Sequence, residues 1–117
     1  MLTCEGNIIH LTRGDSAVLS LKIQREDGAD YELQAGDSVL FTMKKSVYDT
    51  AIIVQKKLAD GVIKLNPDDT KQLPYGTYYY DVELTQFDGF VATVISPQKL
   101  IIEPEVTYEW KNRNDTE

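Results

Sequence analysis

The clearest signal of the fold lies in residues 73–82, which read Leu73-Pro74-Tyr75-Gly76-Thr77-Tyr78-Tyr79-Tyr80-Asp81-Val82. From residue 78 onward, a bulky side chain occupies every second position as far as Leu84. Such alternation predicts a β-strand with one face buried.

The same period of two recurs through most of the chain. In one run, Val39, Phe41 and Met43 share a face, and Thr42 and Lys44 share the opposite face. This pattern is typical of half-buried strands in an antiparallel sheet. Together with shorter β-rich runs, it predicts strands at Asn7–Thr12, Ala17–Gln24, Val39–Lys44, Ala51–Leu58, Gly61–Leu65, Tyr78–Leu84, Phe90–Ser96 and Gln98–Glu103.

Turn signals separate these runs. The pairs Asp27-Gly28, Asp60-Gly61 and Asp88-Gly89 each tolerate positive φ, which is the commonest mark of a short hairpin. Pro97 and Pro104 flank the last run, as expected of a strand that lies at a sheet edge or ends there.

Only one short helical turn is predicted, near Pro67–Gln72. Asn66 is suited to the N-cap, and Pro67 to the first turn. Asp68 and Asp69 would face the positive end of the helix dipole. Short strands with frequent turns therefore predict an all-β fold, either a sandwich or, as the alternative, a barrel.

The spacing Gly76-x-Tyr78-x-Tyr80 resembles the tyrosine corner of immunoglobulin-like sandwiches. The resemblance implies that Tyr78 packs inward while its hydroxyl bonds a backbone group just upstream. Tyr80 would then stand where antibody domains place a disulfide cysteine. The chain has a single cysteine, Cys4, and its only tryptophan is Trp110. The predicted fold is therefore an immunoglobulin-like antiparallel β-sandwich without a disulfide.

Composition restricts the partners of this sandwich. The 117 residues include 12 Lys and Arg against 19 Asp and Glu, so the net charge is −7. An acidic surface repels phosphate backbones and anionic lipid, which argues against nucleic acid and membranes as partners. We expect residues 1–107 to form a single domain and residues 108–117 a polar C-terminal tail. No signal peptide is expected, because no apolar run follows a basic stretch at the start.

The sequence predicts no catalytic residues, no cofactor and no metal site. Cys4 and His10 could serve as nucleophile and base, but no third residue stands out to orient them. The acids at Asp68 and Asp69 lack the short regular spacing of a calcium loop. The tripeptide Arg13-Gly14-Asp15, known as an integrin ligand, is better explained as a turn between strands.

Aromatic residues give the candidate contact surface. Alternation places Tyr78 and Tyr80 inside and leaves Tyr75 and Tyr79 as an exposed pair. In the tail, Tyr108 and Trp110 are further candidates for contact.

The order of these motifs resembles small immunoglobulin-like proteins of phages and prophages in Gram-positive bacteria. The likeness is strongest to the N-terminal domain of the phage baseplate upper protein. The segments that carry it are Leu11–Asp15, Val39–Thr50, Lys64–Leu84 and Leu100–Thr107.

This resemblance implies a non-catalytic structural module of a tail, baseplate or capsid-associated assembly. Such a module would pack against other phage structural proteins or against itself. It would reside in the bacterial cytoplasm during assembly and then in the particle. The alternative function is a carbohydrate- or cell-surface-binding module that uses Tyr75 or Tyr79.

Overall fold

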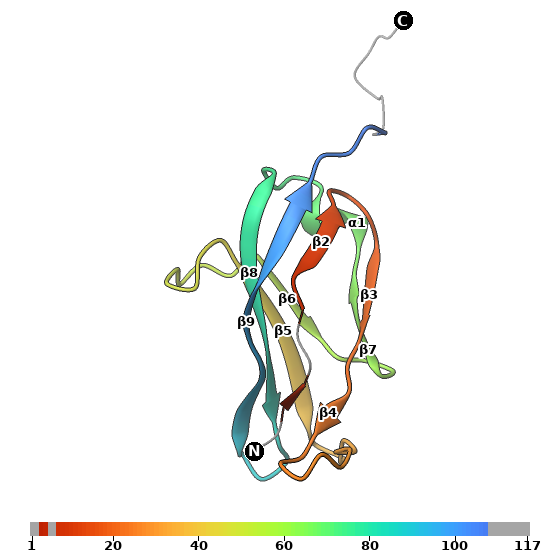
Figure 1. The fold of residues 1–117 in the computed structure, drawn as a ribbon, viewed down its shortest axis with the longest axis vertical. Helices are drawn as coiled ribbons and strands as arrows, with labels where there is room; N and C mark the ends of the chain where they lie inside the picture. The colour runs from red at the N-terminus through yellow and green to blue at the C-terminus, as the bar shows by residue number, and fades with distance from the viewer. Residues whose placement is uncertain (1–2, 5–6, 108–117) are drawn as a thin grey trace, which may run out of the picture.

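A computed structural model of the protein describes residues 3–4 and 7–107 (Figure 1). The described chain is built almost entirely of strands joined by turns. The elements are β1 (Thr3–Cys4), β2 (Ile9–Thr12), β3 (Ala17–Ser20), β4 (Ile23–Gln24), β5 (Ser38–Lys44), β6 (Val54–Lys57), β7 (Val62–Leu65), α1 (Pro67–Thr70), β8 (Gly76–Thr85) and β9 (Val91–Glu103).

The strands form two facing layers. One layer is a five-stranded sheet in the order β2-β9-β8-β5-β6, in which only the β2–β9 pair is parallel. The other layer consists of the antiparallel pairs β3–β7 and β1–β4 (Figure 1). The prediction of an all-β, immunoglobulin-like sandwich without a disulfide is confirmed.

Alternation along the central strands buries one face of each between the layers. On β5, Val39, Phe41 and Met43 are buried and the residues between them are partly exposed. The rings of Phe41 and Tyr80 stack with their centroids 5.4 Å apart. The buried apolar residues form one cluster that takes side chains from both layers: Leu11, Ile23, Val39, Phe41, Met43, Val54, Ile63, Leu65, Tyr78, Tyr80, Val82, Leu84, Val94, Ile95, Leu100 and Ile102.

The predicted strand Ala17–Gln24 is divided in the structure. Its first half, β3, pairs with β7 as far as the pair Ser20–Val62, where the turn at Asp60-Gly61 ends the partner strand. Its second half, β4, pairs instead with β1. A strand continues only where its backbone N–H and C=O groups find partners on a neighbouring strand. Because β3 and β4 pair with different strands, the pairing is interrupted between them.

The two strands predicted on either side of Pro97 are one strand, β9. The pairing of β9 with β8 shifts register twice, and each shift leaves β9 with one more residue than β8. The first shift lies between the pairs Tyr80–Gln98 and Val82–Ile95, and the second lies between Val82–Ile95 and Glu83–Thr93. β2 covers only the last part of β9, from Leu100 to Glu103. Pro97 therefore lies outside the β2–β9 ladder, so its missing N–H interrupts none of that ladder's hydrogen bonds.

The predicted helical turn is present as α1. The backbone N–H of Asn66 donates to the Asp69 carboxylate at 2.6 Å, which is half of a capping box. Thr70 is buried at the end of this turn, and its hydroxyl accepts a hydrogen bond from the Gly14 N–H at 2.8 Å. Among the described residues, no helix has the length and apolar character to cross a membrane.

At the start of β8 the chain makes a tight corner. Gly76 has a φ of +136°, a value that side chains with a Cβ rarely adopt. Two residues later, the hydroxyl of buried Tyr78 donates to the Pro74 carbonyl at 2.7 Å. Burial raises the pKa of Tyr78, so its hydroxyl remains a donor at physiological pH.

Replacing Tyr78 by phenylalanine should lower the free energy of unfolding by about 1 kcal/mol, because the Pro74 carbonyl loses its donor. Tyr48→Phe is the matched control, since Tyr48 is 92% exposed. Urea unfolding, followed by far-UV circular dichroism, measures the free energy of unfolding of both variants. Equal stability of the two variants would contradict a stabilising corner.

Candidate functional site

Two of the aromatic residues predicted as a contact surface, Tyr75 and Tyr79, lie on different elements of the structure. Tyr79 points outward from the middle of β8 and is half-buried, whereas Tyr75 lies in the turn before that strand. Tyr75 takes part in a cluster with Arg13 and Glu105. Tyr108 and Trp110 lie outside the described residues.

Tyr79 lines a groove on the outer face of the five-stranded sheet, with a volume of about 320 Å³. We call it the sheet-face groove. Its floor consists of outward-facing side chains of β5, β6 and β8, in which Thr42 lies opposite both Gln55 and Asp81 in the strand pairing. The residues that line it are Leu40, Thr42, Lys44, Val47, Ile52, Gln55, Tyr79, Tyr80, Asp81, Glu83 and Pro97.

A projecting loop forms one wall of the groove. Residues 45–53 join β5 to β6 and extend away from the body of the sandwich (Figure 1). Val47 and Ile52 of this loop are exposed and line the groove, and Tyr48 is exposed beside them. Three large apolar side chains on one short loop are more than the scattered exposure of an ordinary surface.

The groove also carries charged and hydrogen-bonding groups. The Gln55 amide donates to the Thr42 hydroxyl at 3.1 Å. Burial raises the pKa of Asp81, and the nearby positive charge of Lys44 partly offsets that increase. Apolar walls with a few polar groups on the floor are suited to binding and orienting a ligand or a partner side chain.

Apart from the groove, a cluster of Arg13, Tyr75 and Glu105 holds the chain in place where it leaves β9. The Arg13 guanidinium contacts Glu105 through two nitrogens, with Nε–Oε1 and Nη2–Oε1 distances of 3.1 Å. It also lies 4.2 Å from the centre of the Tyr75 ring, while the Tyr75 hydroxyl donates to Glu105 at 2.8 Å. Because Arg13 is engaged in this way, the Arg13-Gly14-Asp15 stretch does not present a free arginine.

Glu105 should make this cluster sensitive to acid. The hydrogen bond from Tyr75 and the contact with Arg13 hold the pKa of its carboxyl below the usual range. A carboxyl whose pKa is lowered by folding stabilises the fold above its unfolded pKa, and that stabilisation is lost as pH falls through the folded pKa. We therefore expect wild type to be more stable than Glu105→Gln at pH 7, with the difference shrinking in acid.

Denaturant unfolding of both proteins from pH 7 down to pH 3 measures this difference. Glu103→Gln is the control for a neighbouring carboxyl, since Glu103 bonds the exposed His10 at 2.8 Å instead. A difference between wild type and Glu105→Gln that does not change with pH would contradict the assignment.

Among the side chains that the structure describes, those considered for catalysis or metal binding do not come together in one site. His10 is exposed on β2 and contacts Glu103, and the side chain of Cys4 lies outside the described part of the structure. Asp69 caps α1 and pairs with Lys56 at 3.0 Å. In the described residues, no group of three or more His, Cys, Asp or Glu side chains could hold a metal ion.

Sequence reasoning did not identify the sheet-face groove. Alternation indicated that Tyr79, Asp81 and Glu83 share a face, but not that this face is hollowed. The hollow depends on the 45–53 loop and on Pro97, which reach the groove from other elements. The sequence pattern predicts the apolar run Ala51-Ile52-Ile53-Val54 as part of a strand, but its first three residues belong to the loop.

Comparison with known proteins gives a fold and no family. No protein-family profile matches the sequence, and no curated protein is similar to it. Among solved structures, CopC from Methylosinus trichosporium OB3b is similar, with a TM-score of 0.50 and 12% identity over 93% of this chain and 100% of CopC. At that identity the likeness concerns the β-sandwich alone.

This finding corrects the resemblance to phage and prophage proteins. CopC is not a phage protein, and neither a family profile nor a curated protein links the chain to a phage particle. The motifs behind that resemblance were turn and strand signals such as the Asn66 cap and Gly76-x-Tyr78. Any immunoglobulin-like sandwich needs such signals, so they identify the fold and not the lineage.

Proposed function

We propose that the protein is a non-catalytic module that acts by packing against other proteins through the sheet-face groove and the 45–53 loop. The observation that carries this proposal is the exposure of Val47, Tyr48 and Ile52 on a loop that borders the groove. Keeping three large apolar side chains in water is unfavourable, and a partner that covers them removes that cost.

The arrangement of polar groups supports the same proposal. Lys44, Asp81 and Glu83 lie on the floor of the groove beside the apolar wall, so a partner can combine apolar contacts with polar ones, as protein interfaces do. The groove provides no pair of groups positioned as nucleophile and base, which is why we propose binding and not a reaction.

Site-specific photo-crosslinking in the native host tests this function. A benzophenone amino acid at position 48 should give a discrete protein adduct, and the adduct should be lost when Val47 and Ile52 are changed to serine. The control places the same group at Val18, which is 59% exposed on β3 in the other layer. Equal adducts from positions 48 and 18, or none from position 48, would contradict the proposal.

A carbohydrate ligand is the second candidate, and one observation favours it. Tyr79 lies in the groove with Asp81, Glu83 and Gln55, and an aromatic ring beside hydrogen-bonding side chains suits a sugar. Calorimetric titration with soluble oligosaccharides should then detect binding that Tyr79→Ala removes. Tyr75→Ala should retain it, because Tyr75 belongs to the cluster with Arg13 and Glu105.

A further inference from the structure

The end of the sandwich formed by the β8–β9 turn carries a second apolar surface. Phe87 and Phe90 flank the Asp88-Gly89 turn and are 67% and 58% exposed. Val91, next in the chain, and Leu33, in the neighbouring loop, are also exposed. We call these four residues the hairpin-end patch. The loop of residues 87–89 is closed by backbone hydrogen bonds from the Gly89 N–H to Gln86 and from the Gln86 N–H to Phe90, both at 2.8 Å. Neither bond requires a phenylalanine side chain, so turn formation does not explain the two aromatic residues.

A network of hydrogen bonds holds this patch in place. Asp37 accepts from the Phe87 N–H at 2.9 Å, from the Gln34 N–H at 2.9 Å and from the Tyr31 hydroxyl at 2.6 Å. Gln86 in turn donates to the Tyr31 hydroxyl at 2.9 Å. The Tyr31 hydrogen bond, with the two backbone N–H groups, lowers the pKa of Asp37 and so keeps it ionised. The patch is therefore presented on an ordered support.

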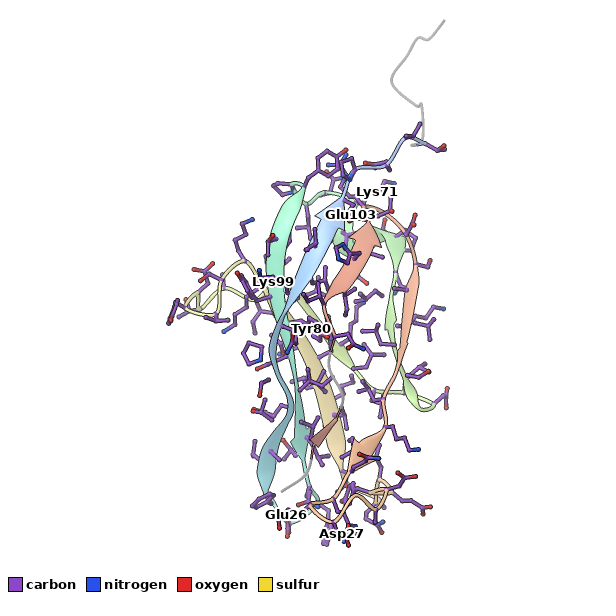
Figure 2. The ribbon with its side chains drawn as sticks, viewed as in Figure 1. Glu26, Asp27, Lys71, Tyr80, Lys99 and Glu103 are labelled. Atoms are coloured by element: carbon purple, nitrogen blue, oxygen red, sulfur yellow. The ribbon has the colours of Figure 1, made fainter. Side chains whose placement is uncertain are left out.

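The patch is surrounded by negative charge. Figure 2 shows Glu26 and Asp27 at this end of the molecule, next to the β8–β9 turn. Residues 25–37 and 86–91 together contain six carboxylates and a single cation, Arg25, so most of the chain's net charge of −7 lies here. The Lys22 ammonium lies 3.7 Å from the Asp30 carboxylate, but both side chains are largely exposed. This ion pair therefore offsets little of the negative charge.

We propose that the hairpin-end patch docks a protein segment whose apolar side chains are flanked by lysine or arginine. Apolar burial over the two phenylalanines provides affinity, and the carboxylates steer and orient the basic flanks. A second copy of this chain fits poorly, because its own patch would bring the same negative charges together. This surface lies at the β8–β9 end, apart from the sheet-face groove, so the inference does not depend on the proposed function.

Titration of the isotope-labelled protein with a synthetic peptide tests the docking. The probe is a short peptide with leucine and tryptophan at its centre and lysines on both sides. Amide shifts should change in residues 25–37 and 86–91. The double variant Phe87→Ser/Phe90→Ser should weaken binding at least about tenfold, and Asp27→Asn/Asp88→Asn should weaken it about threefold at low salt.

Each variant has a matched control. Asparagine retains the oxygen that accepts the turn hydrogen bonds of Asp27 and Asp88. The double variant Asp49→Asn/Asp60→Asn removes the same two charges at exposed turns elsewhere. Tyr48→Ser removes an exposed aromatic from the 45–53 loop and should leave binding unchanged. Circular dichroism checks that all variants fold.

Four results would overturn the inference. The first is shift changes confined to the sheet-face groove, and the second is unchanged affinity in the phenylalanine variant. The third is equal binding of a lysine-only peptide with the same charge, which would indicate charge attraction alone. The fourth is self-association in light scattering that Phe90→Ser abolishes, which would make a second copy the occupant.

Discussion

Replacing Phe41 by alanine is expected to lower the free energy of unfolding by about 4 kcal/mol. The side chain is fully buried at the centre of β5 and stacks on the ring of Tyr80. Alanine would leave a cavity between the two layers and would also remove the ring contact. Urea or thermal unfolding of the purified chain measures the loss.

Phe90→Ala is the matched control, because the same side chain is removed from a site that is 58% exposed. Its cost should stay below about 0.5 kcal/mol, as is usual for surface substitutions. The pair of variants separates the two uses of phenylalanine in this chain, one for stability and one for contact. Similar losses in both variants would show that the hairpin-end patch stabilises the domain, and would weaken the argument that it is available to a partner.

The parts of the fold that could be predicted are those encoded locally. Whether Val39 and Met43 face inward depends on their parity along a strand, and the cap at Asn66 depends on residues within a single turn. The hydrogen bond between Tyr78 and Pro74 also joins residues only four apart. Short-range features of this kind leave their mark on the order of residues.

The functional surfaces depend on contacts between distant segments, which the sequence pattern does not contain. The groove forms because Ile52, from the 45–53 loop, and Pro97, from β9, both lie beside the outer face of β8. The hairpin-end patch is ordered because Asp37 reaches the backbone of Phe87, 50 residues away. Even the path of β9 through Pro97 depends on which strands lie beside it. Alternation specifies the face of each residue but not its neighbours.

The two surfaces suggest how the module would work. β8 turns into β9 at one end of the sandwich (Figure 1), and the residues of the hairpin-end patch belong to this end. The sheet-face groove lies instead on the outer face of the five-stranded sheet. β8 contributes to both surfaces. Tyr79 of β8 lines the groove, and Thr85, the last residue of β8, precedes the hairpin turn. Because one surface borders the middle of β8 and the other lies beyond its end, a partner at one proposed surface would not obstruct a partner at the other.

Replacing Gly76 by asparagine is expected to lower the free energy of unfolding by about 3 kcal/mol. Space is not the reason, because an added Cβ would meet only Lys45 Nζ, at an ordinary 3.6 Å. The reason is the φ of +136°, which lies far from the left-handed region near +57° that asparagine tolerates. Gly61→Asn is the control, since its φ of +80° is much closer to that region, and it should cost less than about 1 kcal/mol.

A double-mutant cycle shows how this strain acts. If Gly76 allows the turn that brings the Tyr78 hydroxyl to Pro74, then Tyr78→Phe should cost less in the Gly76→Asn background than in wild type. Urea unfolding of the two single variants and the double variant gives this coupling. Equal losses at positions 76 and 61 would contradict the backbone argument. A cycle without coupling would separate the glycine from the tyrosine corner, leaving Gly76 as a requirement of the turn alone.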